Sequence, residues 1–109
     1  MSRRKAHLPP FVAIGRHTLT VPEWRTGLSS SEKIIYLHLK SKFVGHNNGE
    51  IVLHYSELLD MFSSATISKA LKGLEKKGWM EKTKQGGLYR YTNKYRLTFK
   101  YDNAYAKFN

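Results

Sequence analysis

The chain has 109 residues, the length of a single domain, and 40% of them are apolar, which is enough for one hydrophobic core. Its 19 lysine and arginine residues outnumber the 8 acidic residues, so the formal net charge is +11. There is no cysteine, which excludes disulfide bonds, thiolate zinc sites and thiol catalysis.

The apolar runs are only a few residues long, so no segment is expected to span a membrane. The basic start Met1–Lys5 is followed by prolines rather than by a long apolar stretch, and it does not resemble a secretory signal. The excess positive charge indicates a polyanionic partner, either nucleic acid or an anionic membrane surface. We expect a cytoplasmic, nucleoid-associated protein that binds nucleic acid and no membrane.

The positive charge is concentrated in one part of the chain. Ten basic residues lie between Ser63 and Lys100, where only Glu75 and Glu81 oppose them, and the preceding segment Glu50–Phe62 has no lysine or arginine. A merely solvated surface mixes both signs, so this block predicts one continuous cationic contact surface. The alternative is a face that is charged only for solubility.

In chain order, residues 1–10 are expected to form a flexible basic arm, 11–101 a folded domain, and 102–109 a C-terminal tail. The short apolar run Phe11–Ile14 predicts either a strand or an extended segment packed on the core. Trp24 is expected to anchor this N-terminal part of the domain.

The first helix is expected to begin after Ser29, because Ser29 and Glu32 have the spacing of a capping box. Apolar residues then cover two faces, with Ile35, Leu39 and Phe43 on one and Ile34 and Leu37 on the other. This pattern predicts a central helix that is packed on two sides and ends at Gly45.

Two short elements are expected next. Glu50–Leu53 predicts a strand, and apolar residues at Tyr55, Leu58, Leu59 and Phe62 have the spacing of a short amphipathic helix. A third helix is expected from about Ala65 to Lys77, with a serine cap before it and Gly78 after it. Its buried stripe is Ile67, Ala70, Leu71 and Leu74.

A β-hairpin is expected to close the domain. Trp79–Thr83 predicts one strand, and Gln85–Gly87 predicts the turn. The returning strand is expected to run through Tyr95–Tyr101, where apolar and basic residues alternate.

This order of elements predicts an α+β winged helix-turn-helix, with three helices and a small antiparallel sheet whose hairpin is the wing. From Leu28 to Phe99 the chain also resembles small winged-helix DNA-binding proteins of bacteria, plasmids and phages. The most specific stretch is TISKALKGLEKKG, which covers the recognition helix and the glycine before the wing. His54 and Gly73 depart from that pattern. Gly73 is interpreted either as drift or as room for a phosphate or base edge.

Helix geometry places one side of the third helix opposite its buried stripe, free to enter a major groove. The residues expected to contact DNA there are Ser64, Ala65, Thr66, Ser68, Lys69, Lys72 and Lys76. The wing would add Lys82, Lys84, Gln85 and Arg90, and the arm would add Arg3, Arg4 and Lys5. The alternatives are wing lysines that only protect a strand edge, and an arm that makes no contact.

The sequence has no motif for catalysis, metal binding or a cofactor, so we expect no enzyme. The partner is expected to be double-stranded DNA, bound by a transcriptional regulator or, alternatively, by a plasmid or phage replication initiator. A protein-interaction module and a single-strand or RNA binder that stacks bases on Tyr89, Tyr91 and Tyr95 are further alternatives. A monomer is favoured because little chain follows the last expected strand.

Overall fold

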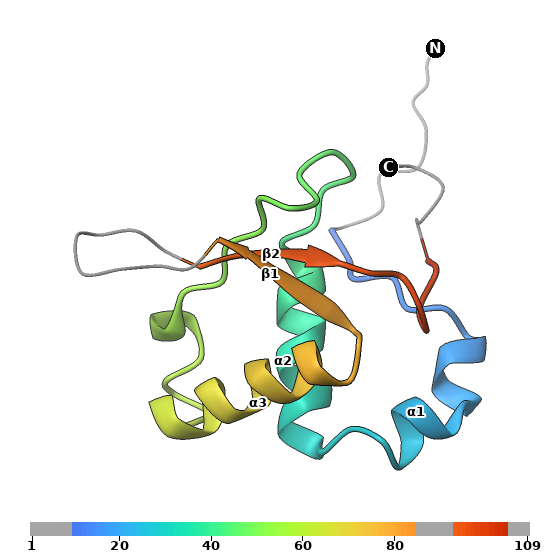
Figure 1. Ribbon diagram of the computed structural model, residues 1–109, viewed down its shortest axis with the longest axis horizontal. Coiled ribbons are helices and arrows are strands. Elements are labelled where there is room, and N and C mark those ends of the chain that lie inside the picture. The colour runs from blue at the N-terminus through green and yellow to red at the C-terminus, as the bar shows by residue number, and fades with distance from the viewer. Residues whose placement is uncertain (1–9, 85–92, 105–109) are drawn as a thin grey trace.

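A central helix, α2 (Ser30–Ser41), lies behind a second long helix, α3 (Ser64–Lys76), in the computed structural model of the chain (Figure 1). The structure describes residues 10–84 and 93–104. A short helix, α1 (Pro22–Arg25), precedes α2, and strands β1 (Met80–Lys84) and β2 (Lys94–Leu97) form a two-stranded antiparallel sheet. The described chain is therefore a small α+β domain.

The start of α2 confirms the predicted capping box. The Ser29 hydroxyl accepts from the Glu32 amide at 3.2 Å, and the Glu32 carboxylate accepts from the Ser29 amide at 2.8 Å. The second apolar face predicted for this helix is only partly covered, because Ile34 is 38% exposed and Leu37 is half-buried. Among the described residues, Val12 of the extended N-terminal segment lies beside Leu37 and His38 on that second face. The helix also ends at Ser41 rather than at Gly45.

The amphipathic helix predicted over residues 55–62 is also wrong. The segment forms one 3-10 turn, Tyr55–Glu57, followed by further turns, although Leu58 is fully buried as its spacing suggested. Short helices gain little from propagation, and this segment is confined between a bridge at Ile51 and the cap of α3. The strand predicted over residues 50–53 is reduced to that bridge, in which Ile51 pairs with Tyr95.

β2 stops earlier than its alternating pattern predicts. It ends at Leu97, which pairs with Met80 of β1, and Thr98 then donates its amide to the Trp79 carbonyl. Phe99 follows with a φ of 58°, in the left-handed region that turns the chain out of the sheet. Its ring packs edge-on against Phe43, with 5.5 Å between ring centroids. A contact with the end of α2 therefore replaces the continuation of the strand.

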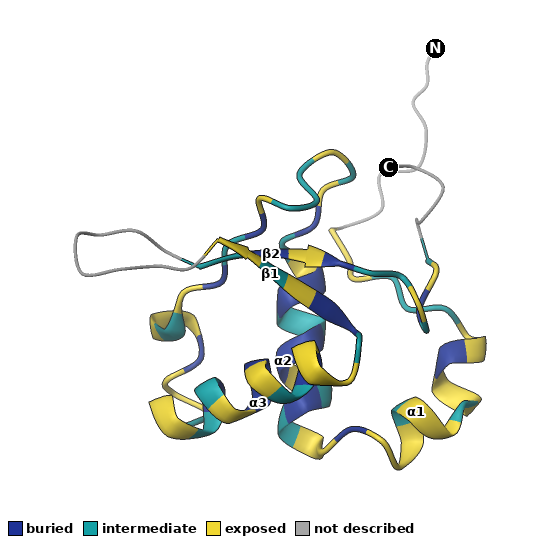
Figure 2. Cartoon of the chain, viewed as in Figure 1, coloured by how far each residue is buried: buried dark blue, intermediate teal, exposed yellow. Residues whose placement is uncertain are grey.

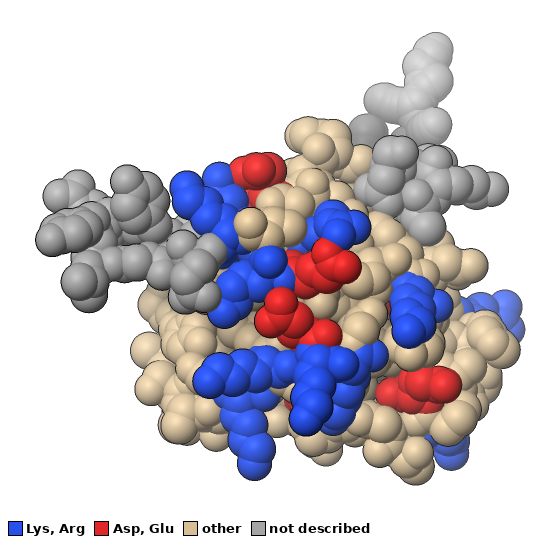
Figure 3. Space-filling model, viewed as in Figure 1, with Lys and Arg blue, Asp and Glu red and all other residues tan. Residues whose placement is uncertain are grey.

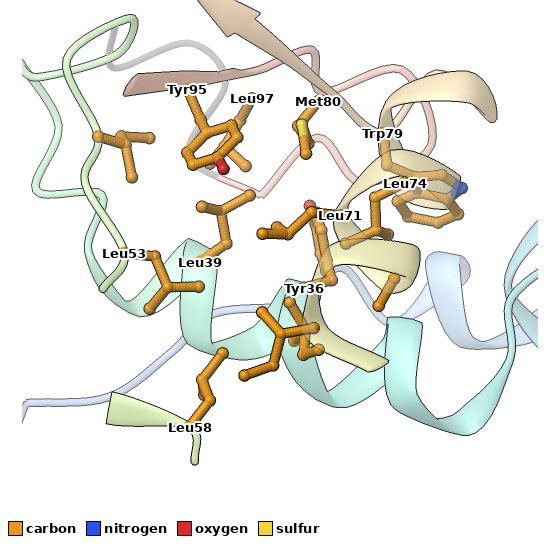
Figure 4. Close-up of a cluster of buried hydrophobic side chains, with 14 of the residues drawn as sticks. Tyr36, Leu39, Leu53, Leu58, Leu71, Leu74, Trp79, Met80, Tyr95 and Leu97 are labelled. Carbon is orange, nitrogen blue, oxygen red and sulfur yellow. The ribbon is translucent and has the colours of Figure 1, made fainter. Parts of the chain in front are cut away.

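One hydrophobic core lies between α2, α3 and the sheet. Figure 2 shows buried residues along α2, and Figure 4 shows side chains from several elements meeting in this cluster. The predicted stripe of α3 is confirmed, since Ile67, Ala70, Leu71 and Leu74 are all buried. Trp24 of α1 packs against Tyr36 and Trp79, which confirms it as the anchor of the N-terminal segment.

A buried polar cluster joins both ends of the described chain to α2. The Asp102 carboxylate is 1% exposed and accepts from the Tyr36 hydroxyl at 2.8 Å and from the Lys40 ammonium at 2.5 Å. Its other oxygen accepts from the Gly15 amide at 2.9 Å. Burial and the neighbouring Asp102 charge raise the pKa of Tyr36, so its hydroxyl stays a donor. Asp102, assigned to the tail from the sequence, thus packs inside the domain.

We expect Asp102→Ala to destabilise the fold by about 3–5 kcal/mol, because it leaves the Lys40 ammonium buried without a counter-charge. Urea denaturation measures this loss, and Asn103→Ala is the exposed neighbouring control. If Asp102→Ala does not fold, the apolar pair Lys40→Met with Asp102→Leu is expected to restore folding. A loss of less than about 1 kcal/mol for Asp102→Ala would contradict this role.

Candidate nucleic-acid interface

The side of α3 that faces away from the core carries the residues that the sequence predicts there. Ala65, Lys69, Lys72 and Lys76 are exposed, while the apolar stripe on the other side is buried. The helix is positioned at its start by Ser63, whose hydroxyl accepts from the Thr66 amide at 3.2 Å. It is ended by Gly78, whose φ of 88° suits a residue that follows a helix. Local sequence therefore determines which side of α3 faces solvent.

The lysines on the exposed side of α3 differ from most other cations of the same region. Within residues 10–84 and 93–104, Lys69, Lys72 and Lys76 form no ion pair. By contrast, the Lys94 ammonium pairs with the Glu50 carboxylate at 2.6 Å, and Arg96 pairs with Glu81 across the sheet. The exposed side of α3 thus offers three lysines that no described carboxylate neutralises.

Two of the predicted contact hydroxyls are engaged within the protein. The Thr66 hydroxyl accepts from the Ser63 hydroxyl at 3.0 Å, and the Ser68 and Tyr55 hydroxyls lie 2.7 Å apart. Ser64 is exposed in the first turn of α3. Of the predicted hydroxyl contacts, Ser64 is therefore the one that faces solvent without a side-chain hydrogen bond in the described chain.

Only part of the predicted wing lies within the described residues. Lys82 is half-buried and Lys84 is exposed, both in β1. Tyr95, an alternative candidate for stacking on bases, is buried in the core. The predicted contacts Gln85, Arg90, Arg3, Arg4 and Lys5, together with Tyr89 and Tyr91, lie outside the described residues.

The cationic surface is divided rather than continuous. Figure 3 shows one group of lysine and arginine side chains over α3 and another over the sheet, with acidic side chains between them. The Glu75 carboxylate of α3 accepts from the Lys82 amide of β1 at 3.2 Å, so it lies in this gap. Over the described residues, the single continuous surface predicted from the charge count is therefore wrong, because Glu75 lies between the two groups and Glu81 pairs with Arg96 within the sheet.

The position of α3 against α2 depends on Glu32. Its carboxylate, already bonded to the amide of Ser29, also accepts from the Lys77 ammonium at 2.7 Å, just beyond the end of α3. A Cβ atom on Gly73 would collide with the same carboxylate. Gly73 thus allows a buried carboxylate of α2 to approach α3, which contradicts the interpretation that it admits a phosphate or base edge.

The charge of Glu32 is stabilised where it lies. Burial alone would raise its pKa, but the hydrogen bonds from Lys77 and Ser29, together with the Lys77 charge, outweigh burial and lower the pKa below the ordinary value. The carboxylate therefore stays ionised at neutral pH. It caps the first turn of α2 through Ser29 and forms an ion pair with Lys77 at the end of α3, so it joins the two helices.

The residues that sequence analysis missed are Tyr55, Asn93 and Glu75, which line a pocket beside α3 together with Ser68. They come from separate elements, and no spacing in the sequence links them. In the described parts of the chain, no group of three or more metal-binding side chains lies together, and no helix is long and apolar enough to cross a membrane.

No protein family, curated protein or solved structure matches the chain.

We expect Gly73→Ala and Glu32→Ala to be strongly coupled. Alanine favours a helix over glycine by about 1 kcal/mol, but in the wild type its Cβ displaces the Glu32 carboxylate from its partners. In the Glu32→Ala background that clash is gone, so Gly73→Ala is expected to stabilise by about 1 kcal/mol. Urea denaturation of the four proteins gives the coupling. An equal effect of Gly73→Ala in both backgrounds would show that the two residues do not interact.

We expect part of the stability to be lost at acid pH through Glu32. Because its pKa is lowered in the folded state, its contribution is complete above the ordinary value of 4.5 and disappears as the pH falls through the lowered value. Thermal unfolding of the wild type and of Glu32→Gln should therefore converge at acid pH. Glu50 and Glu57, whose pKa values are also lowered, are present in both proteins, so they cancel in this comparison. A constant difference across the range would exclude Glu32 as the source.

Proposed function

We propose that this chain binds double-stranded DNA and regulates transcription, with α3 in the major groove and the β1–β2 hairpin against the flanking backbone. The observation that carries the proposal is the set of exposed lysines on α3, Lys69, Lys72 and Lys76, which have no ion-pair partner in the described chain. Lysines without internal partners can replace the counterions that surround DNA phosphates. The net charge of +11 supports the same partner.

The proposed fold class is a winged helix-turn-helix in which one helix is reduced. In such folds a helix and a tight turn precede the recognition helix. Here Tyr55–Glu57 and the turns up to Ser63 take that place, and a hairpin follows α3 directly. The element order around α3 supports the assignment, and the missing α-helix is its main departure.

We propose that the chain contacts mostly the phosphate backbone of DNA rather than its base edges. α3 presents lysines, Ser64 and a methyl group at Ala65, but none of the arginine, asparagine or glutamine side chains that read base edges with two hydrogen bonds. Phosphate contacts give affinity and position with little sequence information. We therefore propose a binding protein without enzymatic activity, localised with the nucleoid and modest in base discrimination.

We expect Lys69→Ala with Lys72→Ala to weaken duplex binding and to lower the slope of log affinity against log salt by about 2, or 0.9 for each lost phosphate contact. Fluorescence anisotropy with a random-sequence duplex, measured between 50 and 200 mM salt (about a thousandfold loss for six phosphate contacts), gives both values. The matched control is Arg16→Ala with Arg25→Ala, which removes the same charge from exposed positions outside α3.

The two double variants separate a specific surface from general charge. If both lower duplex affinity equally, α3 is not the contact surface. If the wild type binds the single strand of the same sequence more tightly than the duplex, single-strand binding replaces the proposal.

A further inference from the structure

A polar pocket of about 190 Å³ lies between α3 and the two strands, with Tyr55 on a further side. At about 30 Å³ for each water, this space holds roughly six water molecules. Its lining combines hydroxyl groups, a carboxylate, lysines and the apolar side chains of Leu71 and Met80. The proposed duplex contact uses the outer side of α3, which shares Lys72 with the pocket and gives most of the other lining residues no role.

Tyr95 supplies a buried donor to this pocket. The residue is 1% exposed, and the Asn93 side-chain amide, which also lines the pocket, donates to its hydroxyl oxygen at 3.3 Å. Figure 4 shows Tyr95 projecting from β2 into the cluster of buried side chains. Within the described residues, nothing accepts the hydrogen of the Tyr95 hydroxyl. Burial raises the pKa of Tyr95, so the hydroxyl keeps that hydrogen at neutral pH.

A second donor comes from the hydroxyl pair of Tyr55 and Ser68. The two oxygens are 2.7 Å apart, so one hydroxyl donates to the other. The hydrogen of the accepting hydroxyl then has no acceptor among the described residues. A ligand in the pocket is thus offered two hydroxyl hydrogens, and the one on the buried Tyr95 requires an acceptor.

The other polar groups restrict the ligand further. Glu75 lines the pocket, and its carboxylate takes one hydrogen bond from the Lys82 amide, which leaves lone pairs for an N–H donor. Lys72 and Lys82 also line it and favour an anionic group. Phosphate alone fits poorly, because Glu75 repels it and because it has no apolar surface to pack against Leu71 and Met80. The pocket suits a flat ring with acceptors and an N–H donor, attached to a phosphate.

We propose that this pocket binds a single nucleotide, with its base against Leu71 and Met80, its ring acceptors on the Tyr95 and Tyr55–Ser68 hydroxyls, and its phosphate toward Lys72 and Lys82. The base N–H groups face Glu75. The nucleotide is either a free mononucleotide or an unpaired residue of a bound strand. The inference rests on the pocket and does not require duplex binding.

The first test uses the full chain labelled with ¹⁵N and titrated with each of the four 5′-deoxymononucleotides, and with inorganic phosphate at matched ionic strength. Saturable shifts at the amides of Ser68, Asn93 and Tyr95 are expected with at least one nucleotide and not with phosphate. Tyr95→Phe is expected to weaken that binding about three- to tenfold, as the loss of one hydrogen bond predicts.

Tyr101→Phe, the same change outside the pocket, is expected to leave nucleotide binding unaltered. Glu75→Gln, on the exposed side of the pocket, provides a second variant if Tyr95→Phe does not fold. It is expected to weaken nucleotide binding without weakening the response to phosphate, because it removes a charge that repels phosphate. Equal shifts with phosphate and nucleotides would overturn the proposal.

The second test compares a fully paired duplex with one of the same length that holds one unpaired nucleotide. If the pocket takes an unpaired residue of a bound strand, the duplex with the unpaired nucleotide is expected to bind more tightly. Tyr95→Phe is then expected to remove this preference and nothing else. If the pocket takes a free mononucleotide, both duplexes are expected to bind equally, and the titration with mononucleotides is expected to show binding. If neither mononucleotides nor the unpaired nucleotide bind at the pocket, the inference fails, while the affinity of the wild type for the fully paired duplex decides the duplex proposal separately.

Discussion

The Glu32 carboxylate is the contact on which the arrangement of the two long helices depends. It caps α2 through Ser29, holds Lys77 beyond the end of α3 and occupies the space that the missing side chain of Gly73 leaves open. A buried carboxylate needs several partners to remain charged, so it fixes the relative position of the groups that surround it. This contact ties the end of α3 to the first turn of α2, while the buried stripe of α3 decides which of its sides faces solvent.

The parts of the fold that the sequence predicted correctly are determined by neighbours within a few residues. The Ser29 capping box, the buried stripe that begins at Ile67 and the glycine after α3 depend on backbone geometry over one or two turns. The segment after Tyr55 and the end of β2 were predicted incorrectly, because distant contacts override the local pattern. The bridge at Ile51 and the packing of Phe99 on Phe43 are such contacts.

The same distinction applies to the candidate site. Helix periodicity was sufficient to place the α3 lysines on the exposed side. It did not show that Ser68 bonds to Tyr55 or that Glu75 crosses to β1, since these pairs form only when separate elements meet. The division of the cationic surface has the same origin, because a count of charges along the chain carries no information on where the opposing carboxylates fall.

The hydrogen bond between the Gly15 amide and the Asp102 carboxylate brings two positions far apart in the chain side by side. The Thr18 hydroxyl adds a second link, since it donates to the Tyr101 carbonyl at 2.7 Å. Both links lie on the α1 side of the molecule, whereas α3 crosses in front of α2 (Figure 1). The segments that hold Gly15 and Asp102 therefore keep each other in place, and neither can leave the domain without exposing a buried carboxylate.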